Sequence, residues 1–162
     1  MIIVLMGVSG SGKTTVGRIL AEQLGWKFVE GDDFHPAANV EKMRSGIALQ
    51  DEDRRPWLAA LQARLEIACE RGENIVLACS ALKDDYRDFL ESHDTACVEF
   101  VYLRGTEQLI QSRLKQRKGH FMDPALLRSQ FEALEPPAGE IEVNIDATPE
   151  AIVNEIRRQL GV

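Results

Sequence analysis

The segment Gly7-Val8-Ser9-Gly10-Ser11-Gly12-Lys13-Thr14 decides the fold of this chain. It matches the pattern G-x-x-x-x-G-K-S/T in full, and it lies between an apolar run, Ile2–Met6, and a segment of helical periodicity, Lys13–Leu24. At ordinary residue frequencies this pattern arises by chance on the order of once in 30,000 positions. The segment therefore predicts a phosphate-binding loop between a strand and a helix.

Each part of this loop is suited to hold a nucleotide. Its glycines let backbone N–H groups turn toward phosphates, and the positive end of the following helix dipole favours the same anions. Lys13 is expected to reach the β- and γ-phosphates and to act in catalysis, while the Thr14 hydroxyl is placed to ligate Mg²⁺. The predicted cofactors are therefore ATP and Mg²⁺. The loop residues expected to bind ATP are Gly7, Val8, Ser9, Gly10, Ser11, Gly12, Lys13, Thr14 and Thr15.

Short apolar runs alternate with segments of helical periodicity along the rest of the chain. This alternation is typical of a three-layer α/β fold with a parallel sheet. Five strands are expected, at Ile2–Met6, around Phe28 and Val29, at Ile75–Cys79, at Cys97–Leu103 and around Ile141–Ile145. Helices are expected at 13–24, 53–71 and 106–117, the last capped by Thr106, and after Thr148-Pro149. Between residues 118 and 139 the pattern loosens, so a mobile flap is predicted there.

Composition limits the classes of function. The chain has 162 residues, is 44% hydrophobic and carries a formal net charge of −7, which predicts one globular domain (1–162) that does not bind nucleic acid. The apolar run Met1–Met6 is too short for a signal peptide and no stretch approaches a membrane span, so a cytoplasmic protein with no membrane partner is expected. Cys69, Cys79 and Cys97 lack metal-ligand spacing and are predicted to be buried free thiols.

The strand at Ile75–Cys79 lacks the magnesium-binding Asp that motor ATPases and GTPases carry at such a strand end. A kinase acting on a small molecule does not need that residue if another carboxylate helps to hold the metal. Glu30 and Asp32, at the tip of the second strand, are the candidates, with Thr14 and Glu30 as the predicted metal ligands.

The segment Glu30–Pro36 is expected on the acceptor side, because parallel strands end at one edge of the sheet. A carboxylate there accepts the proton of an attacking hydroxyl, and we assign this role to Asp32. A capping role is the alternative: one of Asp32 and Asp33 is expected to cap the helix that starts near Pro36, and the other to act in the site. Asn39, Lys42 and Met43 share one helix face, which either lines a polyol pocket or is solvated.

Three arginines are candidates for contacts with anions. Arg54 lies in a charged segment around Trp57 and is suited to bind a substrate carboxylate. Arg113 and Arg117 lie four residues apart on one helix, just before the predicted flap. Arginines on a closing flap stabilise the charge of phosphoryl transfer, although an ordinary basic helix end has the same pattern. Arg113 is predicted to bind ATP and Arg117 to act in catalysis.

From end to end the chain resembles the gluconate kinases (gluconokinases) of bacteria and eukaryotes. The segments that carry the resemblance are Leu5–Lys13, Gly31–Pro36, Asn39–Met43, Gly46, Asp51–Leu58, Cys79–Lys83, Tyr86-Arg87, Arg113-Leu114, Arg117–Phe121, Gln130-Phe131 and Leu134–Pro136. The phosphate loop is shared with many families, whereas Asp33-Phe34-His35-Pro36 and Arg55-Pro56-Trp57-Leu58 are much narrower signatures.

The resemblance implies a fold like that of adenylate kinase, with a 2-3-1-4-5 parallel sheet and an acceptor-binding region at about 32–58. It implies transfer of the γ-phosphoryl group of ATP to the C6 hydroxyl of D-gluconate. Asp32 looks like the acceptor-side carboxylate, and the residues that look like substrate contacts are His35, Arg54, Lys83 and Arg87. Arg117 looks like the arginine of a lid at about 117–127. The family is commonly dimeric, and related sugar-acid kinases often have Asp at the position of Glu30.

Other functions compete with this interpretation. A kinase of the same fold acting on shikimate or a nucleoside monophosphate shares the phosphate loop, but a nucleotide acceptor needs a stacking pocket and the chain is only 6% aromatic. A regulatory nucleotide-binding module predicts ATP binding without turnover. A P-loop protein acting on nucleic acid is disfavoured by the net charge and the missing strand-end Asp.

Overall fold

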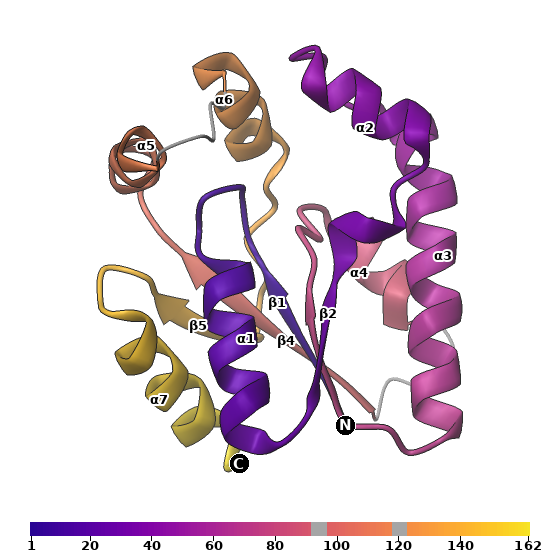
Figure 1. Ribbon diagram of the computed structural model, residues 1–162, viewed down its shortest axis with the longest axis vertical. Coiled ribbons are helices and arrows are strands. Elements are labelled where there is room, and N and C mark those ends of the chain that lie inside the picture. The colour runs from indigo at the N-terminus through magenta and orange to yellow at the C-terminus, as the bar shows by residue number, and fades with distance from the viewer. Residues whose placement is uncertain (92–96, 118–122) are drawn as a thin grey trace.

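The computed structural model describes residues 1–91, 97–117 and 123–162, which form one parallel sheet with helices on both faces (Figure 1). The sheet has five strands in the order β2-β3-β1-β4-β5, and every pairing is parallel. The strands are β1 (Ile2–Met6), β2 (Lys27–Glu30), β3 (Ile75–Ala78), β4 (Val98–Arg104) and β5 (Ile141–Asn144). The predicted strand order and the edge position of the last strand are confirmed.

The helices begin and end close to the residues that the sequence indicated. They are α1 (Lys13–Leu24), α2 (Ala37–Arg44), α3 (Asp51–Glu70), α4 (Asp84–Glu91), α5 (Glu107–Gln116), α6 (Pro124–Ala133) and α7 (Pro149–Leu160), with a 3₁₀ turn η1 at Gly31–Phe34. Thr106 and Thr148 cap α5 and α7 through their hydroxyls, as predicted. Helix α6 occupies part of the segment where only a flap was expected. None of the helices in the described parts of the chain is long and apolar enough to cross a membrane.

Alternate residues of β1 face two separate apolar layers. Ile2, Val4 and Met6 pack with residues of α3 and α4, whereas Ile3 and Leu5 pack with residues of α1 and α7. All of β1 is buried, as expected of a central strand in a parallel sheet covered on both faces. The phosphate loop after β1 is therefore fixed at its base by both layers of the core.

The carboxyl ends of the strands meet at one edge of the sheet, where α2 and α6 stand on either side of the phosphate loop (Figure 1). The backbone N–H of Gly7, directly after β1, donates to the carbonyl of Ser80, just beyond the end of β3, at 3.2 Å. A Cβ on Gly31 would lie 2.4 Å from the carbonyl oxygen of Ala78, so glycine alone permits this approach of the two chain segments. These contacts bring the ends of β1, β2 and β3 together around one site.

The expectation of three free thiols is wrong. Cys69 and Cys97 form a disulfide between the end of α3 and the residue before β4, with their Cα atoms 6.1 Å apart. That separation lies within the usual range for disulfides, and it arises because the fold brings together positions 28 residues apart. Cys79 is the buried free cysteine, and burial raises the pKa of its thiol to about 12.

Candidate active site

A cavity of about 480 Å³ with both polar and apolar lining residues opens at the carboxyl edge of the sheet. Its walls come from the phosphate loop, the segment after β2, helices α2, α3 and α6, and the segment after β3. Residues that line it include Ser9, Lys13, Asp32, His35, Met43, Arg54, Trp57, Ser80, Leu82, Tyr86 and Gln130. The cavity thus joins the phosphate loop to the predicted acceptor region, 32–58, and its size suits a small ligand.

The phosphate loop has the open backbone that phosphate binding requires. Gly10 has a φ of +80°, a left-handed conformation that glycine adopts without steric cost. The Lys13 ammonium donates to the carbonyls of Gly7 and Val8, each at 3.0 Å, and so lies folded against its own loop. Removal from water lowers the pKa of Lys13, while the carboxylate of Asp32 opposes this shift. Lys13 and Asp32 both line the cavity, and their opposite charges interact there.

Thr14 and Glu30 offer two oxygen ligands side by side. The Thr14 hydroxyl donates to the Glu30 carboxylate at 2.7 Å. Neighbouring oxygens around an octahedral Mg²⁺ lie about 3 Å apart, so this pair fits two adjacent positions of the ion. In the described parts of the chain no cluster of three His, Cys, Asp or Glu could hold a metal by itself. The arrangement suits an ion that draws its other ligands from phosphate groups and water.

The position of Asp32 depends on the residue before it. The indole N–H of Trp57 donates to the Gly31 carbonyl at 2.8 Å, and this bond is buried. With Gly31 also held against Ala78, the backbone places the Asp32 side chain in the cavity wall while leaving it 72% exposed. Neither Asp32 nor Asp33 caps α2, because the N-cap residue is Pro36 and no side chain bonds there. The expectation of a capping Asp is wrong: both lie in the intervening 3₁₀ turn.

His35 is held rigidly beside Asp32. Its ring stacks on Trp57 with centroids 4.5 Å apart and an interplanar angle of 11°, and its side chain is only 5% exposed. Burial lowers the pKa of His35, the Asp32 carboxylate opposes the shift, and Arg54 adds to it. The imidazole is therefore neutral near pH 7 and lines the cavity as a hydrogen-bonding group.

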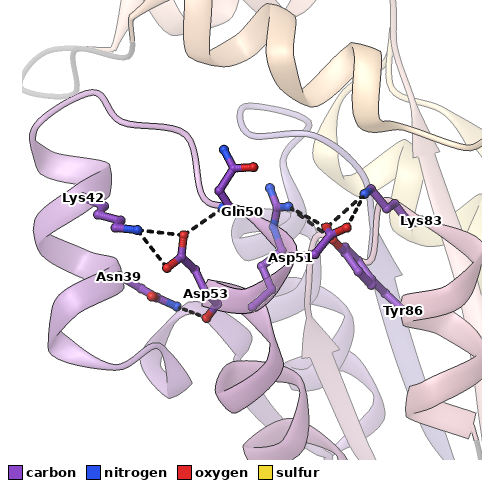
Figure 2. A network of polar contacts seen from close by, with 8 residues as sticks. Asn39, Lys42, Gln50, Asp51, Asp53, Lys83 and Tyr86 are labelled. Atoms are coloured by element: carbon purple, nitrogen blue, oxygen red, sulfur yellow. Dashed lines mark hydrogen bonds and ion pairs between the residues drawn. The ribbon is translucent and has the colours of Figure 1, made fainter.

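A polar network at the start of α3 joins Asp51, Lys83 and Tyr86 (Figure 2). The carboxylate of Asp51 accepts from the Tyr86 hydroxyl in a very short bond and from the Lys83 ammonium at 2.9 Å. Arg54 donates to the Tyr86 hydroxyl at 3.2 Å, so the phenol links the two charged groups. Arg54 and Tyr86 line the cavity, whereas Lys83 and Asp51 support them from outside its wall.

Asp51 and Tyr86 were missed as site residues by sequence reasoning. The hydrogen bond from Tyr86, followed by that from Lys83, lowers the pKa of Asp51, so its carboxylate stays charged. Helices α3 and α4 bring these residues together across 35 positions. No local pattern marks such a pair, although both lie in the segments that resemble gluconate kinases.

The same first turn of α3 also holds α2. Asp53 accepts from the Lys42 ammonium at 2.8 Å and from its own N-cap backbone, the N–H of Gln50, at 2.8 Å (Figure 2). Asn39 is buried and donates to the Asp53 carbonyl at 2.7 Å. Met43 lines the cavity. Of this trio, Asn39 is buried, Lys42 is partly exposed and paired with Asp53, and only Met43 lines the cavity, so the face is neither wholly solvated nor wholly part of the pocket.

Gln130 on α6 contacts the phosphate loop directly. Its side-chain oxygen accepts from the Ser9 backbone N–H at 2.7 Å, and its nitrogen donates to the Ser9 hydroxyl at 3.2 Å. Gln130 also lines the cavity, so α6 closes the wall opposite α2. The sequence offered no signal for this role beyond the resemblance at Gln130-Phe131.

Arg113 and Arg117 lie on the other side of the phosphate loop. They line a second cavity of about 250 Å³ together with Gly10, Gly12 and Thr15 of the loop, Ala147 before α7 and Pro149 at its first position. Arg113 is anchored by a short hydrogen bond to the Ile145 carbonyl. Arg117 is exposed and adds to the lowering of the Lys13 pKa. Of the predicted lid, 117–127, residues 118–122 lie outside the described residues and 124–127 begin α6.

The predicted substrate contact by Arg87 is not supported by its position. Its guanidinium is buried outside the cavity wall, where it donates to the Ala81 carbonyl at 2.8 Å and the Glu135 carbonyl at 2.9 Å and pairs with Asp84. Ala81 has a φ of +41°, a strained conformation for a residue with a Cβ. Arg87 therefore holds the segment after β3 in place behind the site.

Replacing Arg87 with leucine is expected to lower the free energy of unfolding by roughly 2–4 kcal/mol, because two buried carbonyls lose their donor. Chemical denaturation measures this loss directly. The KM for the acceptor should change by no more than about threefold at temperatures where the variant stays folded. A variant of unchanged stability with a much higher acceptor KM would contradict the structural role.

A phosphate loop at the edge of a 2-3-1-4-5 parallel sheet, open to an acceptor cavity that carries charged side chains, defines a P-loop kinase. Solved shikimate kinases share this fold, for example the enzyme from Bacteroides thetaiotaomicron with a TM-score of 0.71 and 21% identity over 100% of this chain and 99% of that one. A family model described as an AAA domain matches residues 2–137. The family implies ATP binding.

Relatives of higher sequence identity are named as gluconokinases. The chain is 47% identical over 164 residues to a probable gluconokinase of Mus musculus, covering 90% of this chain and 89% of the relative. It is 46% identical to the thermosensitive gluconokinase of Escherichia coli, covering 88% and 79% of the two chains. A gluconokinase structure from Sinorhizobium meliloti superposes with a TM-score of 0.90 at 45% identity, over 98% and 90% of the chains. The chain belongs to the gluconokinase family.

Proposed function

We propose that this protein transfers the γ-phosphoryl group of ATP to the C6 hydroxyl of D-gluconate, giving 6-phospho-D-gluconate and ADP. The observation that carries the proposal is that the phosphate loop, Asp32 and Arg54 all line one cavity. Gluconate has one carboxylate and a chain of hydroxyls. The cavity offers a cation that can bind the carboxylate and hydrogen-bonding groups that can bind the hydroxyls.

In the proposed reaction the Asp32 carboxylate orients the C6 hydroxyl and accepts its proton as the oxygen attacks the γ-phosphorus. The new O–P bond forms while the bond to the ADP oxygen breaks, in line with the attack. Lys13 leaves its loop carbonyls to bind the β- and γ-phosphates, and Arg117 supplies positive charge from the opposite side. Both cations stabilise negative charge on the transferring group.

Magnesium is proposed to bind at Thr14 and Glu30, whose oxygens lie side by side. When bound with the nucleotide, the ion neutralises phosphate charge and so favours attack by a hydroxyl. Glu30 stands where related sugar-acid kinases often have Asp, and its longer side chain reaches the Thr14 hydroxyl from the end of β2.

Gluconate is proposed to place its carboxylate at Arg54, which lines the same cavity as the phosphate loop. Arg54 is oriented by the Tyr86 hydroxyl, which is itself held by Asp51. Lys83 adds charge from behind the wall, and His35 contacts a hydroxyl of the sugar chain. This arrangement selects an acceptor with an anionic end and a terminal alcohol.

Replacing Arg54 with methionine is expected to raise the gluconate KM by roughly a hundredfold with a smaller change in kcat, because a charged hydrogen bond to the carboxylate is lost. The matched control is Arg55→Met, which removes an exposed arginine one position along α3 that does not line the cavity. Initial rates over a range of gluconate concentrations measure both effects. Equal KM values for the two variants would contradict the carboxylate site.

The test of the function is ADP release with ATP and Mg²⁺, offering D-gluconate beside shikimate, nucleoside monophosphates and neutral sugars. Turnover confined to gluconate supports the proposal. Turnover with another acceptor would support a kinase activity but contradict gluconate as the substrate. ATP binding with no turnover would favour a regulatory nucleotide-binding module.

We propose further that segment 117–127 closes over the nucleotide as a lid and that the protein works in the cytoplasm as a homodimer. Support for the lid comes from Arg117, which lies at the end of α5 beside the phosphate loop. The location and the dimer rest on composition and on the family resemblance.

A further inference from the structure

We propose that Asn39 fixes the tautomer of His35, so that the imidazole carries its proton on Nε2 and presents it to the hydroxyl of the acceptor. Asn39 is thus a positioning residue: it contacts His35 and acts through that ring without contacting the substrate. The inference rests on the proposed function for its consequence in the reaction, but the tautomer itself is a property of the free protein.

The geometry around Asn39 leaves one assignment of its amide. The carbonyl oxygen of Asp53 lies 2.7 Å from one side-chain atom of Asn39, and a carbonyl oxygen only accepts hydrogen bonds. That atom is therefore the amide nitrogen, Nδ2, because an amide oxygen there would face another oxygen without a hydrogen between them. Asn39 is only 3% exposed, so no solvent-facing alternative relieves such a contact.

The amide nitrogen of Asn39 also determines which ring nitrogen of His35 carries the proton. Asn39 Nδ2 lies 3.2 Å from Nδ1 of His35, and the amide has a second hydrogen to donate. Nδ1 must then accept, which requires that it carry no proton. The proton of the neutral ring consequently lies on Nε2, the nitrogen on the opposite side of the imidazole.

The groups around the ring also oppose a second proton. An imidazolium would direct an N–H at Nδ1 toward the amide hydrogens of Asn39. Trp57 covers one face of the ring from α3, Arg54 repels added positive charge from the same helix, and Asp32 is the charged group that would favour it. Burial outweighs Asp32, so the pKa of His35 lies below its usual value.

Nε2 faces the acceptor side of the cavity. It lies 3.9 Å from Oδ1 of Asp32, which is too far for a direct hydrogen bond. The Nε2–H is thus available to another oxygen. A substrate hydroxyl placed between them accepts from Nε2–H while it donates its own proton to Asp32. With the other tautomer, a bare Nε2 would compete with Asp32 for that proton, and the hydroxyl would be held in the wrong orientation.

The direct test is ¹⁵N NMR of the ring in the full-length protein labelled at histidine. The chain has three histidines, and the spectrum of His35→Gln identifies which signals belong to His35. Long-range ¹H–¹⁵N correlations are expected to show a protonated Nε2 and a bare Nδ1 in the wild type. In Asn39→Asp the carboxylate accepts at that position, so the proton should move to Nδ1 and the pKa of the ring should rise. A wild-type ring protonated on Nδ1 would overturn the inference, whether or not gluconate is the substrate.

Kinetics then test the consequence. Asn39→Asp is expected to lower kcat/KM for the acceptor by about tenfold to a hundredfold through misplacement of the hydroxyl, with the affinity for ATP unchanged. The control is Lys42→Met, which removes another tie between α2 and α3 without touching His35. If Lys42→Met reproduces both the kinetic loss and the tautomer change, Asn39 serves only to tether α2 and the inference fails.

Discussion

Lys13→Ala is expected to lower kcat by about 10³-fold or more, because the transferring phosphoryl group loses its closest positive charge. The ammonium now bonds to the carbonyls of Gly7 and Val8, so it is already held within the loop that receives the phosphates. Burial lowers the pKa of this ammonium, and the Asp32 carboxylate opposes the shift, as phosphate groups bound beside it also would. Coupled ADP release at saturating ATP and gluconate measures the loss.

Lys115→Ala is the control for this variant. Lys115 is an exposed lysine on α5 that lines neither the acceptor cavity nor the cavity beside Arg117, so its loss should leave kcat near that of the wild type. Near-normal turnover by the Lys13→Ala protein would contradict the role of this loop in phosphoryl transfer.

Asp32→Asn is expected to lower kcat by about 10²–10⁴-fold while the affinity for ATP stays near normal. An amide at this position still bonds to the acceptor hydroxyl but cannot take its proton. The side chain lines the same cavity as Lys13, and the hydrogen bond from Trp57 to the Gly31 carbonyl holds the backbone beside it, so the substitution should not disturb the backbone. Nucleotide titration alongside steady-state rates separates the two effects.

Asp33→Asn is the matched control for Asp32. Asp33 lies in the same 3₁₀ turn and is exposed, but it does not line the cavity. Equal losses from both variants would indicate a general effect of charge at the site. Loss of ATP binding in Asp32→Asn would indicate a metal or structural role for that carboxylate instead of a role as base.

Features encoded by neighbouring residues could be read from the sequence. The phosphate loop, the apolar strands and the threonine caps each depend on a few consecutive side chains and on backbone preferences that hold in any context. The parallel sheet places every strand end at one edge, so the location of Asp32 beside the loop also followed from the chain order. The resemblance supplied the strand order and the substrate class.

Features that depend on distant residues could not be read in this way. The disulfide joins Cys69 to Cys97, Asp51 meets Tyr86 across 35 positions, and Gln130 bonds to Ser9 across 121. The family resemblance implied a substrate contact by Arg87, yet its guanidinium donates to buried carbonyls of two separate segments.

The sequence by itself therefore determined that this chain folds as a P-loop kinase and which loop receives the nucleotide, because glycine flexibility, helix dipoles and apolar periodicity are local properties. Only the tertiary structure decided which polar side chains reach the cavity and which support it from behind. Partners for Asn39, His35 and Arg54 come from separate helices, and their protonation states and orientations exist only once those helices pack together.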